Sequence, residues 1–273
     1  FMYEKKVCEE CLSKGYRSCI KKRCVKGSLF ASVVRVFSMK FHKMINVYKD
    51  VYAFITPSEF LKKKLVLNGF EEKRIHCIPT FTASKTTIGE QQIGSYGLYF
   101  GRVTEEKGVE TVIKAYEKLP EYTVKIMGDD TTDEAKRLKK YVENHKIKNV
   151  EFLGFKSGAE LENIIKGARF TLIPSIWYDN LPNTALESFQ YSKPVIASNI
   201  GSLPELVSDG ENGYLFEPSN VEDLIKKIKM LDDDILVKRM GEASRKRLES
   251  RFAPQSHYEA LMKIFNDAAK NRK

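Results

Sequence analysis

The sequence lacks any long apolar run. Its hydrophobic residues make up 42% of the chain but are scattered among 30% charged residues, and no stretch approaches the roughly 18 residues that a membrane-spanning helix needs. A secretory signal is also absent, because Lys5 and Lys6 are followed within four residues by two glutamates rather than by an apolar segment. These absences exclude a membrane-spanning core and favour a cytoplasmic protein. With 273 residues the chain has room for one large domain or two modest ones.

Acidic residues are missing from the segment between Cys11 and Lys49, which carries ten basic residues. Residues 1–85 hold 18 Lys and Arg against 7 Asp and Glu, whereas residues 86–273 are nearly balanced, with 28 against 29. This excess predicts a polyanionic partner for the N-terminal part, and a merely solvated basic face is the alternative. The interleaved aromatic stacking motifs typical of RNA-binding proteins are absent, so we expect no nucleic-acid partner.

Residues 28–49 predict a single amphipathic helix, because apolar side chains recur there at helical spacing and basic ones take the opposite side. The apolar stripe comprises Phe30, Val33, Val34, Phe37, Phe41, Met44, Ile45 and Tyr48. Two interpretations remain open. In the first, the stripe packs on a core and the basic side of the helix faces water. In the second, the stripe docks on an anionic membrane surface, which would place the protein peripherally on the inner face of a membrane.

The rest of the chain alternates strands with helices. A strand is expected at 51–55, then a helix capped by Ser58 and stopped by Asn68-Gly69, and a strand at 75–78. The later strands are expected at 98–100, 122–127, 150–153, 170–173 and 194–197, with helices at about 108–118, 132–145, 158–167 and 183–191. Short apolar strands that alternate with such helices predict an α/β fold with a Rossmann-like, doubly wound parallel sheet. The tail over 221–269 is expected to be helical.

Three loops follow strands of this predicted sheet, where ligands of open α/β sheets bind. The first loop contains Gly101-Arg102-x4-Lys107-Gly108, and two cations beside a helix start suit a diphosphate. The second contains Pro-Ser-x3-Asp179-x7-Glu187, whose carboxylates suit vicinal hydroxyls. The third contains Gly-Ser-x-Pro-Glu over residues 201–205 and leads to Asn-Gly-Tyr-Leu-Phe over residues 212–216. For each loop alone, solvated charges or charges that stabilise a helix dipole are the alternative.

The order and spacing of these four motifs resemble the family 4 retaining glycosyltransferases of the two-domain GT-B fold, over residues 50–265. The resemblance implies transfer of a sugar from a nucleoside-diphosphate sugar to a saccharide or lipid-linked acceptor, in polysaccharide or glycoconjugate biosynthesis. It also implies that no cofactor is required for catalysis, because Arg102 and Lys107 would bind the donor diphosphate and stabilise the leaving group.

The resemblance assigns the other site residues by position. Glu187 would hold the ribose hydroxyls, and Asp179 would face the hydroxyls of the transferred sugar. The family usually has Glu where this chain has Asp179, so the carboxylate is withdrawn by one methylene. The remaining donor-binding assignments are Gly101 at the diphosphate, Phe155 and Lys156 at the nucleobase, and Asn180, Leu181, Pro182 and Asn183 along the sugar and phosphates.

The resemblance also implies a domain plan. Residues 1–85 would be the end of an N-terminal acceptor-side domain and 86–94 a linker. Residues 95–254 would be the donor-binding domain, and 255–273 a helix that crosses back to the N-terminal domain. The catalytic-site histidine of the family has no match among His42, His76, His145 and His257. We therefore expect this chain alone to bind donor and to transfer sugar poorly or not at all, and a non-catalytic nucleotide-sugar-binding module is the alternative.

Four cysteines, Cys8, Cys11, Cys19 and Cys24, form the pattern C-x2-C-x7-C-x4-C. In a reducing compartment this density suggests a structural zinc site, although the spacing is not that of a common zinc ribbon. Free structural thiols and disulfides remain the alternatives. Cys77 is expected to be a lone buried thiol on a strand.

Overall fold

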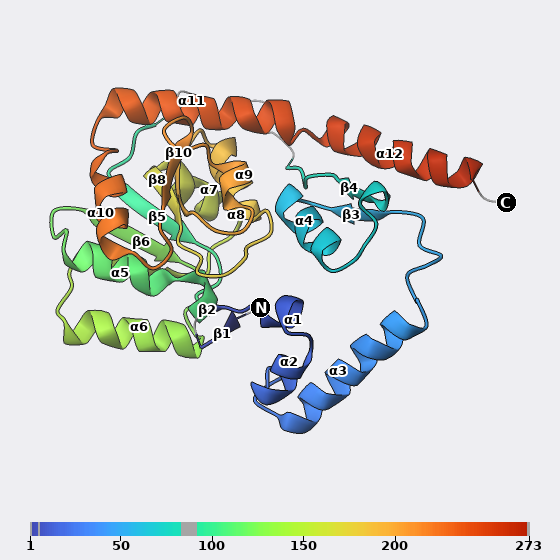
Figure 1. The fold of residues 1–273 in the computed structure, drawn as a ribbon. Helices are drawn as coiled ribbons and strands as arrows, with labels where there is room; N and C mark the ends of the chain where they lie inside the picture. The colour runs from blue at the N-terminus through green and yellow to red at the C-terminus, as the bar shows by residue number, and fades with distance from the viewer. Residues whose placement is uncertain (1, 5, 83–91, 272–273) are drawn as a thin grey trace.

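The computed structural model describes residues 2–4, 6–82 and 92–271, and its centre is a six-stranded parallel sheet (Figure 1). The strands lie in the order β10-β9-β8-β5-β6-β7. Their bounds are β5 Tyr96–Phe100, β6 Thr123–Met127, β7 Val150–Gly154, β8 Ala168–Ile173, β9 Val195–Ser198 and β10 Gly213–Phe216. This order reverses direction between β5 and β8, so the predicted Rossmann-like fold class is confirmed, with its switch point at these two central strands.

Helices cover both faces of the sheet because successive strand residues point to opposite sides. Tyr99 and Leu172 face a core shared with α5 (Val109–Glu117), α6 (Asp133–Asn144) and α10 (Val221–Lys229). The opposite face packs on α7 (Gly158–Lys166), α8 (Asn183–Gln190), the single-turn α9 (Leu203–Leu206) and the end of α11 (Asp234–Arg251). The predicted helices between strands therefore form nearly where the periodicity placed them.

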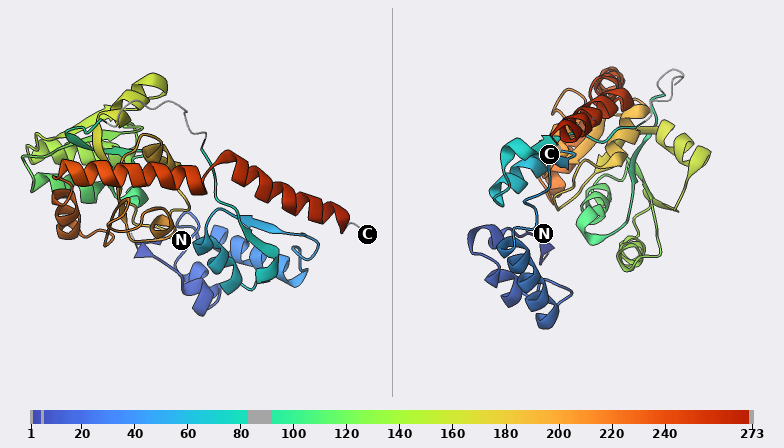
Figure 2. Two further views of the ribbon diagram at one scale, coloured as in Figure 1. Left: turned by 90° about the horizontal axis from the view of Figure 1, so that it is seen from above. Right: turned by 90° about the vertical axis from the view of Figure 1, so that its right-hand side faces the viewer.

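The N-terminal part is a separate set of small elements (Figures 1 and 2). It begins with the antiparallel pair β1 (Met2–Tyr3) and β2 (Lys6–Val7), followed by α1 (Glu10–Ser13), α2 (Arg17–Lys21) and α3 (Leu29–Met44). Next come β3 (Phe54–Thr56), α4 (Glu59–Leu67), a 3-10 turn η1 (Glu72–Arg74) and β4 (Ile75–Cys77), with β3 and β4 paired in parallel. The Ser58 hydroxyl caps α4 as predicted, by accepting a hydrogen bond from the Leu61 amide at 3.1 Å.

The amphipathic helix differs from its prediction in two ways. It ends at Met44 and not at residue 49, because the chain turns over residues 45–50. Its apolar stripe is not covered by the described residues, since the side chains of Phe30, Phe37 and Met44 are 79%, 71% and 74% exposed. Figure 1 shows α3 projecting away from the sheet. The interpretation as a core-facing helix is therefore wrong for the described part of the chain.

The helical tail consists of α10, α11 and α12 (Pro254–Lys270). The last helix runs past the sheet and lies alongside the N-terminal elements (Figure 2). His257 Nδ1 lies 2.7 Å from the Pro79 carbonyl oxygen, and the Asn271 amide donates to the Tyr52 hydroxyl at 3.2 Å. The predicted linker at 86–94 falls largely outside the described residues. The division into domains therefore stays a prediction. Among the helices of the described segments, none is long and apolar enough to cross a membrane.

Candidate functional site

The loops that follow β5 and β8 meet at the switch point of the sheet. The Ile176 amide donates to the Glu106 carbonyl at 3.0 Å and so joins the two loops. Gly108 allows this approach: its φ is +69°, and a Cβ at this position would lie 2.0 Å from the Pro174 carbonyl oxygen. Any other residue would push the loops apart. The sequence therefore brings the Arg102–Lys107 loop against the loop that carries Asp179.

Two adjoining cavities of about 320 Å³ and 360 Å³ lie along these strand ends. They share the lining residues Phe100, Gly101, Arg102 and Thr184, so together they form one trough. We call the end lined by Lys107, Ser175 and Asp179 the cationic end, and the end lined by Phe155, Lys156 and Glu187 the glutamate end. An elongated ligand with an anionic group in its middle fits such a trough, because Arg102 lies where the two cavities join.

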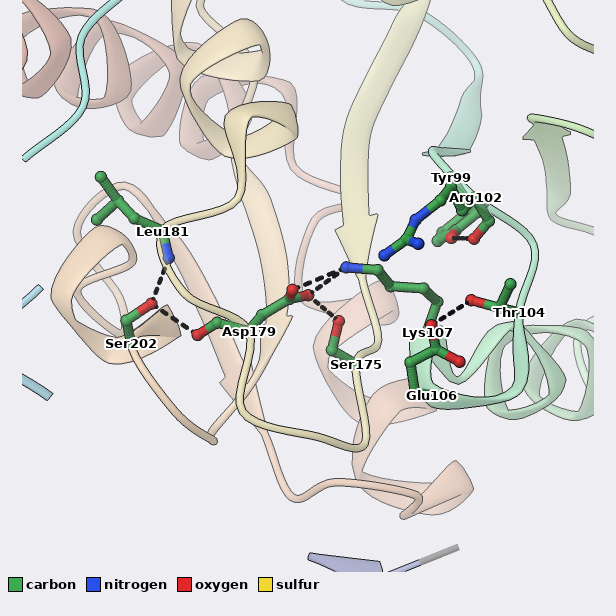
Figure 3. A network of polar contacts seen from close by, with 9 residues as sticks. All are labelled: Tyr99, Arg102, Thr104, Glu106, Lys107, Ser175, Asp179, Leu181 and Ser202. Atoms are coloured by element: carbon green, nitrogen blue, oxygen red, sulfur yellow. Dashed lines mark hydrogen bonds and ion pairs between the residues drawn. The ribbon is translucent and has the colours of Figure 1, made fainter. Parts of the chain in front are cut away.

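The cationic end contains a buried ion pair (Figure 3). The Lys107 ammonium lies 2.7 Å and 2.8 Å from the two carboxylate oxygens of Asp179, and the Ser175 hydroxyl donates to Asp179 Oδ2 at 2.5 Å. The side chains of Lys107 and Asp179 are only 17% and 9% exposed. Both predicted residues therefore lie in the trough, but they are bound to one another.

Arg102 presents a second cation to the same space (Figure 3). Tyr99, which is buried in the sheet, holds the Arg102 backbone by donating its hydroxyl to the Arg102 carbonyl at 2.5 Å. Opposite this loop, α8 begins after Pro182 without a side-chain cap. The first amide groups of α8, at Asn183 and Thr184, therefore keep their hydrogen-bonding capacity at the trough wall. Two cations and a helix N-terminus make an anion site.

Glu187 and Asp129 both line the glutamate end, but the Asp129 carboxylate accepts hydrogen bonds from the amide and the hydroxyl of Thr131. Glu187 comes from the second turn of α8, and burial raises the pKa of its carboxyl. Phe155 is 74% exposed at the rim, and Lys156 beside it pairs with Glu160 at 2.7 Å. An exposed aromatic ring next to a carboxylate suits a nucleoside, because the ring stacks on a base and the carboxylate accepts hydrogen bonds from ribose hydroxyls.

Not every predicted donor residue lines the trough. Gly101, Pro182 and Asn183 do, whereas Asn180 and Leu181 do not. The Leu181 amide, which was predicted to contact the donor, donates instead to the Ser202 hydroxyl at 2.7 Å. The Asn180 side chain turns away, toward the N-terminal part. Leu181, whose backbone is left-handed with φ +51°, is itself buried, whereas Asn180 is exposed.

Sequence reasoning missed several residues of the site. Ser175 belongs to the Pro-Ser-x3-Asp179 motif but was not predicted to contact any residue of the site. Tyr99, Thr184 and Asp129 were not predicted as site residues. For Tyr99, Ser175 and Asp129 the available signal was a position at a strand end or within two residues of it, whereas Thr184 lies in the first turn of α8. Their roles depend on contacts with residues far away in the sequence, which no local pattern contains.

The four clustered cysteines carry free thiols. Within residues 2–4, 6–82 and 92–271, no group of three or more His, Cys, Asp or Glu side chains is placed to hold a metal ion. Burial, together with the neighbouring thiols, raises the pKa of Cys11 and of Cys19. The arrangement gives the zinc hypothesis no support, and structural zinc stays a prediction.

In open α/β sheets ligands bind at the switch point, which is where the cationic trough of this chain lies. Solved structures specify the fold further. A glycosyltransferase from Rickettsia africae aligns with a TM-score of 0.74 and 21% identity, over 83% of this chain and 67% of that one. HepE from Anabaena, solved in complex with UDP and glucose, aligns with a TM-score of 0.71 and 19% identity, over 79% of this chain and 63% of that one. The fold is that of the GT-B glycosyltransferases.

The sequence profile described as "Glycosyl transferases group 1" matches residues 88–247. The chain therefore belongs to the group 1 glycosyl transferases. An uncharacterized glycosyltransferase of Methanocaldococcus jannaschii is 30% identical over 174 residues, which are 63% of this chain and 48% of that protein. A glycogen synthase of Mycobacterium tuberculosis is 29% identical over 207 residues, or 74% of this chain and 47% of that protein. The chain spans about half the length of these curated relatives.

Proposed function

We propose that this chain is the donor-binding part of a family 4 retaining glycosyltransferase. It transfers a hexosyl group from a nucleoside-diphosphate sugar to a saccharide or lipid-linked acceptor, in polysaccharide or glycoconjugate biosynthesis. The observation that carries the proposal is the trough. Its sugar-side aspartate, its central cations and the Glu187 carboxylate at the far end match the order sugar, diphosphate, nucleoside.

The diphosphate lies between Arg102, Lys107 and the first amides of α8. In the transfer step the glycosidic C–O bond breaks, and negative charge grows on the departing phosphate oxygen. The two cations and the helix N-terminus stabilise that charge, so the reaction proceeds without a metal ion. The acceptor hydroxyl attacks from the face that the diphosphate leaves, which gives retention at the anomeric carbon, and its proton passes to the departing phosphate oxygen.

Glu187 holds the ribose hydroxyls, and Phe155 and Lys156 border the nucleobase. Asp179 lies at the sugar end, but its oxygens are already bound to Lys107 and Ser175. A donor phosphate that attracts the Lys107 ammonium releases one of these oxygens for a sugar hydroxyl. Sugar binding and diphosphate binding are therefore linked through this ion pair.

The N-terminal part supplies the acceptor side of the cleft and a contact with an anionic membrane surface. The support is the exposed apolar stripe of α3 next to a segment with no acidic residue. A surface of this kind binds a lipid-linked acceptor where it is made. A non-catalytic nucleotide-sugar-binding module is the second candidate, and the observation that favours it is the saturation of the Asp179 carboxylate by its neighbours.

The first experiment is a metal-free thermal-shift panel with UDP, GDP, ADP, TDP and CMP, run in parallel on Glu187→Ala. UDP is the leading probe because HepE, which shares the fold, is solved with UDP. A nucleotide at about 100 times its dissociation constant adds roughly 2.7 kcal/mol of stability to the folded state. A shift of the wild type by one diphosphate, with little shift of Glu187→Ala, supports the donor site. No shift by any nucleotide in the folded chain refutes it.

A further inference from the structure

Helix α4 of the N-terminal part points its first turn at the loop that carries Asp179. Ser58, which caps α4, is fully buried, and its hydroxyl donates to Asn180 Oδ1 at 2.7 Å. Because the same hydroxyl accepts from the Leu61 amide, its proton is directed to Asn180. The rings of Phe60 and Tyr178 meet edge to face beside this contact, with centroids 4.7 Å apart.

Glu205 completes the cap of α4 from a distant part of the chain. Its two carboxylate oxygens accept hydrogen bonds from the Glu59 amide at 2.9 Å and the Phe60 amide at 2.6 Å. The first amides of a helix have no partner within the helix, and a carboxylate is the favoured partner there. Glu205 is fixed in turn, because Arg247 and Arg251 of α11 donate to its backbone carbonyl at 2.8 Å and 3.2 Å.

Ser202 closes these contacts into a ring. It is fully buried, and its hydroxyl donates to the Asp179 carbonyl at 2.8 Å while it accepts from the Leu181 amide at 2.7 Å (Figure 3). Ser202 and Glu205 lie on the same short turn, at the cap and the third residue of α9. Gly201 lets this turn approach the loop, because a Cβ there would lie 2.9 Å from the Asp179 carbonyl oxygen.

Asn180 is thus held on both sides. Its backbone neighbours, Asp179 and Leu181, are fixed by Ser202, and its side chain is fixed by Ser58. The path from Ser58 through Asn180, Ser202 and Glu205 returns to the first turn of α4. We call it the α4 ring. A shift of α4 therefore acts on the Asp179 loop through two routes at once, one through Asn180 and the other through α9.

We propose that Ser58 and Glu205 are positioning residues of the donor site: through the α4 ring they fix the loop that presents Asp179 and leads into the N-terminus of α8. Neither side chain lines the trough, so each acts through Asn180, Ser202 or the α4 backbone. The inference rests on the proposed donor site. Its consequence is that the N-terminal part governs donor affinity without touching the donor.

The test compares Ser58→Ala and Glu205→Gln with the wild-type chain in two measurements. Calorimetric titration gives the affinity for whichever of UDP, GDP, ADP and TDP the wild type binds, and hydrogen exchange followed by NMR reports the Leu181 amide. Each variant should bind that diphosphate about tenfold more weakly, as expected for a lost hydrogen bond to a charged or buried group. The Leu181 amide should exchange faster, and Ser58→Thr, which keeps a hydroxyl, should restore both values.

Two controls separate positioning from general loss of stability. Glu249→Gln removes a carboxylate that pairs with Arg245 at 2.5 Å on α11. Ser244→Ala removes a buried hydroxyl that donates to the Asn212 carbonyl at 3.0 Å. Both should leave diphosphate affinity and Leu181 exchange unchanged. The double variant of Ser58 and Glu205 should lose less affinity than the product of the single losses, because both act on one loop.

Unchanged affinity and unchanged Leu181 exchange in Ser58→Ala and Glu205→Gln would overturn the inference. If the wild type binds none of the diphosphates, the donor proposal fails and the exchange measurement still decides whether the ring fixes the loop. Faster Leu181 exchange would support the ring, and unchanged exchange would overturn it. Ser58→Ala removes a single oxygen atom, so it remains informative if Glu205→Gln does not fold.

Discussion

Replacing Asp179 by Asn should destabilise the protein and yet strengthen its binding to UDP. In the structure the Lys107 ammonium lies 2.7 Å and 2.8 Å from the carboxylate oxygens of Asp179. A donor diphosphate needs that same ammonium, so the carboxylate and the phosphates compete for one cation. The Asn variant removes the competitor and also a negative charge that repels the diphosphate.

The size of the effect follows from the burial of the pair. At 2.7 Å and an effective dielectric constant of ~20, the gross attraction is about 6 kcal/mol, most of which is offset by the desolvation of both groups. The Lys107 side chain keeps 17% exposure, so water relieves part of the cost of leaving it unpaired. We expect Asp179→Asn to lower the free energy of unfolding by about 2 kcal/mol, somewhat less than for a fully buried pair.

Urea denaturation measures the stability term, and calorimetric titration with UDP measures affinity. UDP should bind Asp179→Asn about tenfold more tightly than wild type, a gain of about 1.4 kcal/mol. Glu222→Gln is the control, because it breaks the exposed Lys118–Glu222 pair, neither member of which lines the trough. It should change stability by less than about 0.5 kcal/mol and leave UDP affinity unchanged. Weaker UDP binding by Asp179→Asn would refute the competition and show that Asp179 orients Lys107 for the phosphates.

Two further predictions concern buried ionisable groups. Burial raises the pKa of Glu187 above its ordinary value of 4.5. Because ribose hydroxyls donate to the ionised form, nucleotide affinity should fall as the pH drops through that raised pKa. Glu187→Gln should lose this pH dependence and keep only that of the phosphates, and identical pH profiles of the two proteins would contradict the assignment. Lys193 donates to the carbonyls of Gln92, Lys166 and Ala168 at 2.6, 2.6 and 2.7 Å, so Lys193→Met should lower the free energy of unfolding by about 2 kcal/mol at pH 7 in urea denaturation. Burial lowers the pKa of Lys193 to about 8, so between pH 8 and 10.5 the unfolded chain holds a proton that the folded chain has released. The free energy of unfolding of the wild type should therefore rise over this window by up to about 3 kcal/mol relative to the Met variant. A parallel pH dependence of the two proteins would contradict the lowered pKa of Lys193.

The regular α/β half was predictable from sequence because its information is local. Each strand from β5 to β9 is a short apolar run and each intervening helix repeats its buried side chains at helical spacing, so periodicity alone placed them within a few residues. Arg102 and Lys107, which follow β5, and Glu187, in the helix that follows β8, line one trough because parallel strands end at the same edge of the sheet.

Contacts between distant segments could not be predicted. Lys107 and Asp179 are 72 residues apart, Ser58 and Asn180 are 122 apart, and Phe60 and Glu205 are 145 apart. No periodicity encodes such partners, so the engagement of Asp179 and the ring around Asn180 were unforeseen. The exposure of the apolar stripe on α3 could not be predicted either, because the same helical spacing is found in stripes that pack on a core and in stripes that do not.

The most direct test of the donor site is a crystal structure of the chain with the diphosphate identified by the nucleotide panel. The two phosphates should lie between Arg102, Lys107 and the first turn of α8. The ribose hydroxyls should donate to Glu187, and the base should lie beside Phe155. A nucleotide bound elsewhere, or one whose ribose does not reach Glu187, would contradict the proposed donor site.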